Sequence, residues 1–175
     1  MQKILVPIMI CFIATGCASL KPAAFEKSTA KLDPVAFFGG HTKSYGVMES
    51  HTGKPSVQIT TETIGTVKDG KVFIEQDLYP GSGQKNHRSW QLKQVDEHNV
   101  EATANDIDGT ARGKLYGNYF TWTFRLIVKE RKFIKHVRMS QYMYLNPDGQ
   151  SLIIRSVIKK FGIIVTEITE EFKKV

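Results

Sequence analysis

The strongest constraint on the fold lies in residues 99–128, where polar and apolar residues alternate around two dipeptides that favour tight turns. Asp108-Gly109 and Gly117-Asn118 each fit the two-residue loop of a β-hairpin. Because side chains alternate between the two faces of a strand, both hairpins must agree on the residues that point inward. They do agree, so the segment predicts a three-stranded antiparallel meander with one buried face.

The buried face predicted from these turns combines small residues with large aromatic ones. Ala104 and Trp122 are expected on either side of Gly113, which leaves room for an indole ring to lie across the strand. In chain order, this face consists of Val100, Ala102, Ala104, Asp106, Ala111, Gly113, Leu115, Phe120, Trp122, Phe124 and Leu126.

Alternation continues through most of the chain after residue 55, with further turn signals between the strands. Asp69-Gly70 predicts a second hairpin, and Pro147 occupies the second position of a four-residue turn over 146–149. Other strands are expected to begin near Val47 and to cover 87–95, 133–145 and 163–172.

One short helix is expected before the strands. Asp33 is a suitable N-cap, Pro34 suits the first helical position, and a pair of glycines follows as a stop signal. Phe37 and Phe38 on this turn would cover an apolar opening of the body.

A meander of about eight to ten antiparallel strands with one apolar face removes its exposed edges most simply by closing into a barrel. We therefore predict an all-β fold, an up-and-down antiparallel β-barrel of the lipocalin-like type with a short N-terminal helix. An open or two-sheet sandwich is the alternative. A barrel of this size can hold a small ligand.

The first residues have the layout of a secretory signal. Lys3 precedes an apolar stretch over 4–13 that is too short to span a bilayer stably. It ends in small residues just before Cys17, an arrangement that resembles the lipobox of bacterial lipoproteins; an ordinary signal peptide with an incidental Cys17 is the alternative. The expected organisation is a signal peptide over 1–16, a lipidated N-terminus and tether over 17–32, and a barrel domain over 33–175.

A lipidated N-terminus also predicts a location. Two or more acyl chains make anchoring stable, and Ala18 and Ser19 lack the Asp that retains such lipoproteins in the inner membrane. We therefore expect the periplasmic face of the outer membrane, with the acyl chains as the membrane contact. The other cysteine, Cys11, falls within the signal peptide, so no disulfide and no metal or catalytic site built on cysteine is expected.

The net charge of +7 suits an anionic lipid surface and would also suit nucleic acid. Lys and Arg are spread along the chain, so scattered solvated side chains explain the charge better, and no nucleic-acid partner is expected. None of the five histidines has the spacing of a metal site, and no nucleophile elbow, P-loop or dinucleotide fingerprint is found. We expect neither a metal nor a cofactor, and we expect that the protein is not an enzyme.

A few polar residues fall on the predicted buried face. A buried charge must be paired or lie in water. Arg88 and Asp106 therefore form a salt bridge, or hydrogen bonds that close one barrel end, or they meet a ligand. In the second interpretation Arg88 binds the anionic head group of a fatty acid or phospholipid, and aromatic residues line the tail. Core packing is the alternative role for the two tryptophans. The candidate ligand-binding residues are Arg88, Trp90, Asp106, Phe120, Trp122, Phe124 and Gln141.

Glycines, aromatics and turn residues also form a longer pattern: Asp106-x-x-Gly109-x-Ala111-x-Gly113-x-x-x-Gly117-Asn118 with Trp122, then Lys160-Phe161-Gly162 and Glu167-x-Thr169-x-x-Phe172. This pattern resembles a family of proteobacterial lipoproteins known as domain of unknown function 3833. The resemblance implies no established activity. Genes of that family tend to lie near enzymes that modify membrane fatty acids, which hints at lipid handling.

These features lead to one functional hypothesis and two alternatives. We expect a non-enzymatic outer-membrane lipoprotein whose barrel binds or shuttles a lipid, a fatty acid or another small hydrophobic molecule. The first alternative is a structural or scaffolding lipoprotein with a filled barrel. The second is a lipid-modifying enzyme that uses Asp106 as acid or base.

Overall fold

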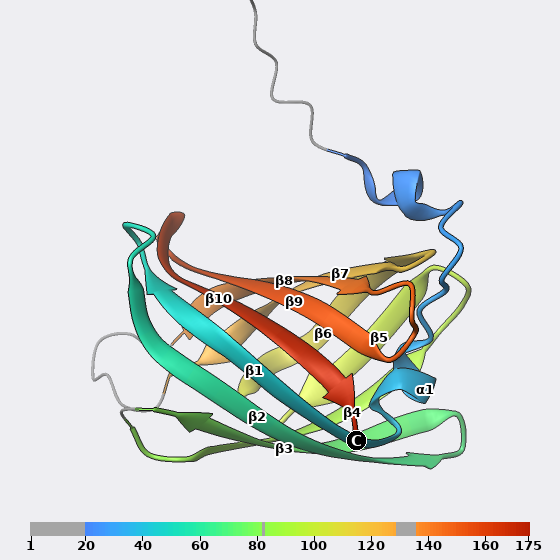
Figure 1. The fold of residues 1–175 in the computed structure, drawn as a ribbon, viewed down its shortest axis with the longest axis horizontal. Coiled ribbons are helices and arrows are strands. Elements are labelled where there is room, and N and C mark those ends of the chain that lie inside the picture. The colour runs from blue at the N-terminus through green and yellow to red at the C-terminus, as the bar shows by residue number, and fades with distance from the viewer. Residues whose placement is uncertain (1–19, 82, 129–135) are drawn as a thin grey trace, which may run out of the picture.

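The computed structural model describes residues 20–81, 83–128 and 136–175, and these residues form a closed antiparallel barrel of ten strands (Figure 1). The strands are β1 Gly40–Ser50, β2 Pro55–Lys68, β3 Lys71–Pro80, β4 Asn86–Gln94, β5 Asn99–Ala104, β6 Ile107–Tyr116, β7 Tyr119–Ile127, β8 His136–Leu145, β9 Ser151–Lys160 and β10 Ile163–Lys174. The expected signal peptide over 1–16, Cys17 and the start of the strand expected over 133–145 lie outside the described residues.

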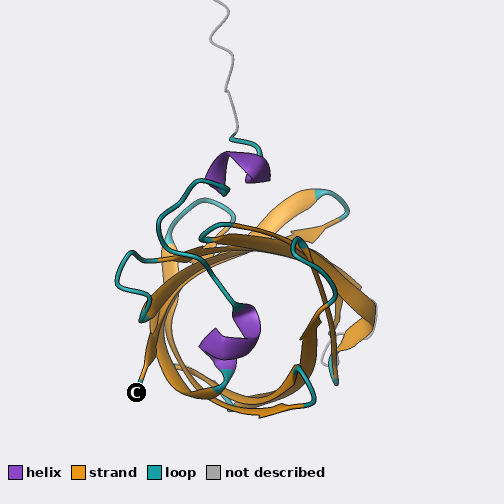
Figure 2. Ribbon diagram, turned by 90° about the vertical axis from the view of Figure 1, so that its right-hand side faces the viewer, coloured by secondary structure: helices purple, strands orange, loops and turns teal. Residues whose placement is uncertain are grey.

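Each strand pairs with the next one along the chain, and β10 returns to pair with β1. This is the up-and-down barrel predicted from the sequence, and closure leaves no free sheet edge. Figure 2 looks along the barrel and shows the strands as a continuous wall around one interior. The expected fold class is therefore confirmed, and the sandwich alternative is wrong.

Three of the predicted turns are confirmed. At Asp69-Gly70 both residues have positive φ, 51° and 69°, as a tight hairpin loop requires, and the flanking lysines of β2 and β3 pair. The turn at Gly117-Asn118 joins β6 to β7, and the turn over 146–149 joins β8 to β9.

The turn predicted at Asp108-Gly109 lies elsewhere. The chain reverses at Asn105 and Asp106, so Gly113 pairs with Val100 instead of the expected Ala104. Partners on β4 explain the change: the backbone N–H of Asn105 donates to the Ser89 carbonyl, and Arg88 holds the Asp106 carboxylate. Because the strand pairing moves by an even number of positions, the residues predicted on the buried face still share that face.

Two smaller details also differ from the expectations. β1 begins at Gly40 rather than near Val47, because its first inward side chains are the hydroxyl residues Thr42 and Ser44 and give no hydrophobic alternation. Gly109, with φ of 77°, lies in an irregular part of the β6–β7 pairing instead of a hairpin loop.

Gly113 pairs with Trp122 as predicted, but it makes room for a different ring. A Cβ atom at this position would overlap the ring of Phe120, which is fully buried. The glycine therefore allows the Phe120 ring to approach β6 closely.

The predicted helix α1, Pro34–Phe38, closes one end of the barrel (Figure 2). Asp33 caps it by accepting a hydrogen bond from the backbone N–H of Ala36 at 3.0 Å. Phe37 and Phe38 are only 3% and 7% exposed, so this short helix carries an aromatic plug into the core.

The segment before α1 contacts the same end of the barrel. A short 3-10 helix, η1 Pro22–Phe25, places Phe25 on the ring of Tyr119, with the ring centroids 4.6 Å apart. The backbone N–H of Leu32 donates to the carbonyl of Gly117, and a Cβ atom on Gly117 would overlap the Phe25 carbonyl. The part of the expected tether that is described is therefore packed against the β6–β7 turn.

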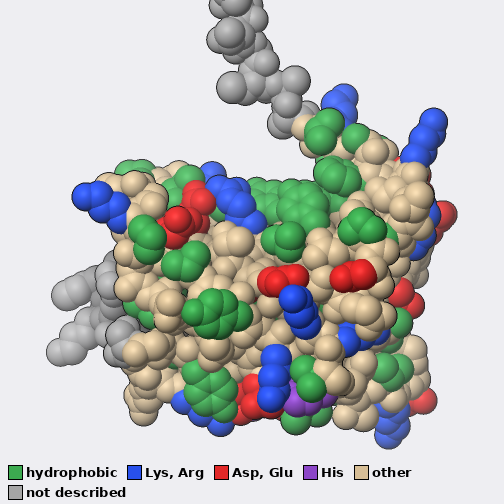
Figure 3. Space-filling model, viewed as in Figure 1, with side chains coloured by type: hydrophobic (Ala, Val, Ile, Leu, Met, Phe, Trp, Pro, Cys, Tyr) green, Lys and Arg blue, Asp and Glu red, His purple; other side chains and the backbone are tan. Residues whose placement is uncertain are grey.

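Charged side chains are interspersed on the face that β1, β2, β9 and β10 present in Figure 3. Opposite charges pair across neighbouring strands there, as between Arg155 and Glu167 at 2.6 Å. Among the described residues, no helix is long and apolar enough to cross a membrane.

We predict that Gly113→Val destabilises the protein by about 1–3 kcal/mol, because the added side chain overpacks the site against Phe120. Urea melts of the variant and the parent measure the difference. Thr110→Val on the exposed part of β6 is the matched control and should change stability by no more than about 0.5 kcal/mol. Equal effects of the two substitutions would contradict this packing.

Candidate functional site

The interior of the barrel contains a cavity of about 580 Å³. Phe38 of α1 and Phe172 of β10 line it at the closed end. Gln84, Asn86 and Asn105 line it at the opposite end, called the open end because the described residues leave it uncovered. The barrel is hollow, so the alternative of a filled barrel is wrong. A cavity of this volume falls within the range of small-molecule sites in proteins.

Two stacked tryptophans form the aromatic wall of the cavity. The rings of Trp90 on β4 and Trp122 on β7 lie 5.0 Å apart and nearly parallel, at 17°. Phe124 packs edge-on against both indoles, and Phe120 packs edge-on against Trp122. Both tryptophans line the cavity, whereas the two phenylalanines are not among its lining residues. Phe120 and Phe124 pack against the indoles, and their expected role in lining a ligand tail stays a prediction.

Gln141 on β8 holds the second indole in place. The Trp122 Nε1–H donates to Gln141 Oε1 at 2.6 Å, and the Gln141 amide donates to Ser156 Oγ at 2.9 Å. A chain of hydrogen bonds thus crosses three neighbouring strands, from β7 through β8 to β9. It fixes the orientation of the Gln141 amide, which also lines the cavity.

Arg88 and Asp106 form an ion pair near the open end. Arg88 Nε and Nη2 both donate to Asp106 Oδ2, each at 2.7 Å, and the guanidinium lies 5.5 Å from the centre of the Trp90 ring. Asp106 Oδ1 is buried and finds no partner among the described residues. The salt-bridge interpretation of this pair is confirmed, and its role in ligand binding stays a prediction.

Glu170 on β10 is a cavity residue that the sequence reasoning missed. It is 7% exposed, and its Oε1 accepts hydrogen bonds from Ser44 Oγ at 2.6 Å and Thr61 Oγ1 at 2.9 Å. Burial raises the pKa of the Glu170 carboxyl, and this effect outweighs the two hydroxyl hydrogen bonds and the charge of Arg88, which lower it.

A signal for Glu170 was present in the sequence. Ile168, Glu170 and Phe172 alternate along β10, and both apolar neighbours are buried. Period-two alternation therefore places Glu170 on the inner face, where a lone carboxyl between two apolar residues marks an unusual site.

Several polar side chains of the cavity come from consecutive strands. Glu170 on β10 is bonded to Ser44 on β1 and Thr61 on β2, and Gln76 on β3 donates to Thr63 on β2 at 3.3 Å. The Arg88–Asp106 pair continues this series on β4. Met139, Met143, Ile154 and Ile158 line the cavity from β8 and β9. The interior is therefore amphipathic, with apolar surface facing polar groups.

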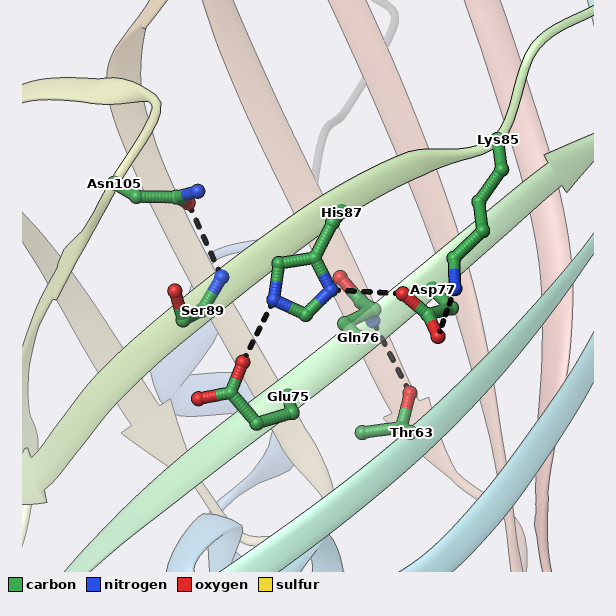
Figure 4. Close-up of polar contacts among 8 residues, drawn as sticks. All are labelled: Thr63, Glu75, Gln76, Asp77, Lys85, His87, Ser89 and Asn105. Carbon is green, nitrogen blue, oxygen red and sulfur yellow. Dashed lines mark hydrogen bonds and ion pairs between the residues drawn. The ribbon is translucent and has the colours of Figure 1, made fainter.

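A second polar cluster lies outside the barrel, on the outward face of β3 and β4 (Figure 4). His87 Nδ1 lies 2.7 Å from Asp77 and its Nε2 lies 2.8 Å from Glu75, while Lys85 lies 2.8 Å from Asp77. The hydrogen bond to Asp77, followed by that to Glu75, raises the pKa of His87. Within the described part of the chain, no group of three or more His, Cys, Asp or Glu residues is arranged to hold a metal ion.

Residues 11–174 of the chain match a protein family described as protein of unknown function (DUF3833). The chain belongs to this family. The family predicted from the sequence is therefore confirmed, and the lipoprotein character of this chain stays a prediction. No curated protein matches the sequence.

Among solved structures, the barrel is similar to the S-type phycobiliprotein lyase CPES from Guillardia theta. The TM-score is 0.61 at 10% identity, over 86% of this chain and 97% of that one. At this identity the likeness shows the fold. The neighbour is a lyase, which contradicts the expectation that this barrel protein is not an enzyme.

We predict that Glu170→Gln stabilises the protein increasingly as pH rises. Because the pKa of Glu170 is higher in the folded than in the unfolded protein, the folded state loses stability as pH rises from the ordinary pKa of 4.5 through the raised pKa. Glutamine does not ionise, so the variant avoids this loss. Urea melts across that range should give equal stabilities at the acid end and a more stable variant at the alkaline end.

Glu171→Gln, on the neighbouring outward position, is the control and should follow the pH profile of the parent. A Glu170→Gln variant whose stability runs parallel to that of the parent at every pH would mean that Glu170 has an ordinary pKa.

Proposed function

We propose that the protein binds a small hydrophobic molecule with an anionic head group, such as a fatty acid or another lipid, inside its barrel. The observation that carries this proposal is the hollow interior of about 580 Å³, lined by apolar and aromatic side chains with a few polar groups. A molecule of this class matches both parts of the lining.

The placement of the charges supports one orientation of the ligand. Arg88 lies close to the start of β4 at the open end, and Phe38 and Phe172 lie at the closed end. Two N–H groups of Arg88 serve Asp106, and a guanidinium has five, so N–H groups remain for a carboxylate or phosphate. The head group would then lie near Arg88 and water, with the tail directed towards α1.

A reaction on the bound molecule is the second candidate. The structural neighbour is a lyase, and the Glu170 carboxyl is a buried acid that faces the same cavity as Arg88. A carboxylic acid whose pKa is raised inside a ligand cavity is a candidate proton donor to the bound molecule.

We further propose that the barrel is anchored to the outer membrane through acyl chains on Cys17. Support comes from the basic start, the short apolar stretch and the small residues before this cysteine. A membrane anchor of this kind would hold the barrel at the membrane surface.

The cavity proposal predicts that Met139→Trp removes bound lipid. Met139 lines the cavity on β8, so the larger indole would occupy space that the ligand needs. Organic extracts of the purified, folded parent should contain lipid in stoichiometric amount by mass spectrometry, and those of the variant should contain at least several-fold less.

Arg138→Trp makes the same substitution at the adjacent outward position and should retain the lipid. Far-ultraviolet circular dichroism and urea melts check that both variants are folded. A parent that carries no lipid after gentle purification, or a folded Met139→Trp variant that carries as much as the parent, would contradict the proposal.

The anchor proposal predicts that Cys17→Ser abolishes labelling by radioactive palmitate and removes the protein from the outer-membrane fraction. Without the sulfur, no lipid thioether forms at this position. Ser19→Ala is the control and should be labelled like the parent. Unchanged labelling and fractionation of Cys17→Ser would mean that the lipobox interpretation is wrong.

A further inference from the structure

The hydrogen bonds around Glu170 use only one of its two carboxyl oxygens. Ser44 and Thr61 both donate to Oε1, and the side chain lines the cavity. Among the described residues, no protein hydrogen bond engages Oε2. The carboxyl therefore has a free oxygen on the side where a ligand would lie.

The two hydroxyl groups that donate to Oε1 also determine which oxygen of a protonated Glu170 carries the proton. A protonated carboxyl has one O–H donor, and its other oxygen remains an acceptor. Because Oε1 already accepts from Ser44 and Thr61, the proton belongs on Oε2. In this form Glu170 offers the cavity a hydrogen-bond donor and no charge.

The charge balance of the cavity depends on this proton. Arg88 and Asp106 neutralise each other, so the cavity carries no net charge from these groups when Glu170 is protonated. Ionised Glu170 would add one negative charge in a largely enclosed, apolar interior, where an anionic ligand would be repelled.

We propose that Glu170 is a ligand-binding residue that donates a hydrogen bond from its protonated carboxyl to an oxygen of an anionic ligand, on the β10 side of the cavity. This inference rests on the proposed function and deepens it, because it assigns a second polar contact besides Arg88. It also restricts the ligand, because a group that accepts hydrogen bonds is favoured at this position.

Two fluorescent probes of similar shape separate charge from hydrophobicity. Anilinonaphthalene sulfonate is an anion, and N-phenylnaphthylamine is its neutral counterpart. The only two tryptophans of the chain, Trp90 and Trp122, both line the cavity. Energy transfer from tryptophan to either probe therefore reports binding in the cavity, with the full-length protein reconstituted in phosphatidylcholine vesicles.

Affinity is measured from acid to mildly alkaline pH for the parent and for Glu170→Gln. In the parent, the affinity for the sulfonate should fall by roughly ten- to hundredfold as Glu170 ionises, the range expected for a lost hydrogen bond to a charged group. The neutral probe should bind with little dependence on pH. In Glu170→Gln, whose amide cannot ionise, the part of the fall in sulfonate affinity that comes from Glu170 should disappear.

Among the described residues, the other charged groups at the cavity are Arg88 and Asp106, with His87 of the outer cluster at its rim, and the groups that contact Glu170 from β1 and β2 are hydroxyls. His87 also loses positive charge as pH rises through its raised pKa, which weakens anion binding in the same direction. This contribution is shared by the parent and Glu170→Gln, so their difference isolates Glu170. His87→Gln is the matched control and should keep the Glu170-dependent fall.

The outcomes distinguish this inference from the proposed function. If neither probe binds in the cavity, the proposed function fails. If both probes bind and the sulfonate profile of Glu170→Gln equals that of the parent, the cavity binds ligands but Glu170 is not a contact, and the inference alone is wrong. A parent whose sulfonate affinity rises with pH would also overturn it.

Discussion

The pairing of β10 with β1 is the constraint on which the rest of the structure depends. It runs from Thr42 opposite Lys174 to Ser50 opposite Thr166 and converts a meander with two free edges into a closed wall. The same pairing brings Glu170 of β10 within hydrogen-bond distance of Ser44 on β1. Closure of the barrel and assembly of the polar side of the cavity are thus a single event.

A second long-range contact sets the geometry at the open end. The Arg88–Asp106 ion pair joins β4 to the turn between β5 and β6, at a point where local turn preference favoured Asp108-Gly109. An ion pair with low exposure is costly to break, because the remaining charge would be left unpaired. Arg88, which holds this turn in register, is therefore also the residue to which the proposed function assigns the head group of the ligand.

Features that depend on residues close together in the chain, such as hairpin turns and the helix cap, were predicted correctly from the sequence. Asp69-Gly70 and Gly117-Asn118 form hairpins through their own backbone preferences, and Asp33 caps α1 through the residues that follow it. Alternation also identified the inner face, but not which of its side chains reach the cavity and which are covered by others, as Phe120 is. The inward position of Glu170 followed from the same alternation, but its partners did not: Ser44 and Thr61 lie 126 and 109 residues away, so that only the closed barrel brings them together.

The contacts of η1 have a consequence for how an anchored barrel would be oriented. Phe25 and Leu32 attach the N-terminal segment beside the β6–β7 turn, at the end that α1 closes (Figure 1). From Cys17 to Leu20 an extended chain spans only about 10 Å. A lipid on Cys17 would therefore hold the plugged end of the barrel next to its own bilayer and leave the mouth directed away from it. A ligand that enters through the open end would therefore be delivered from the aqueous side and not from the bilayer that holds the anchor.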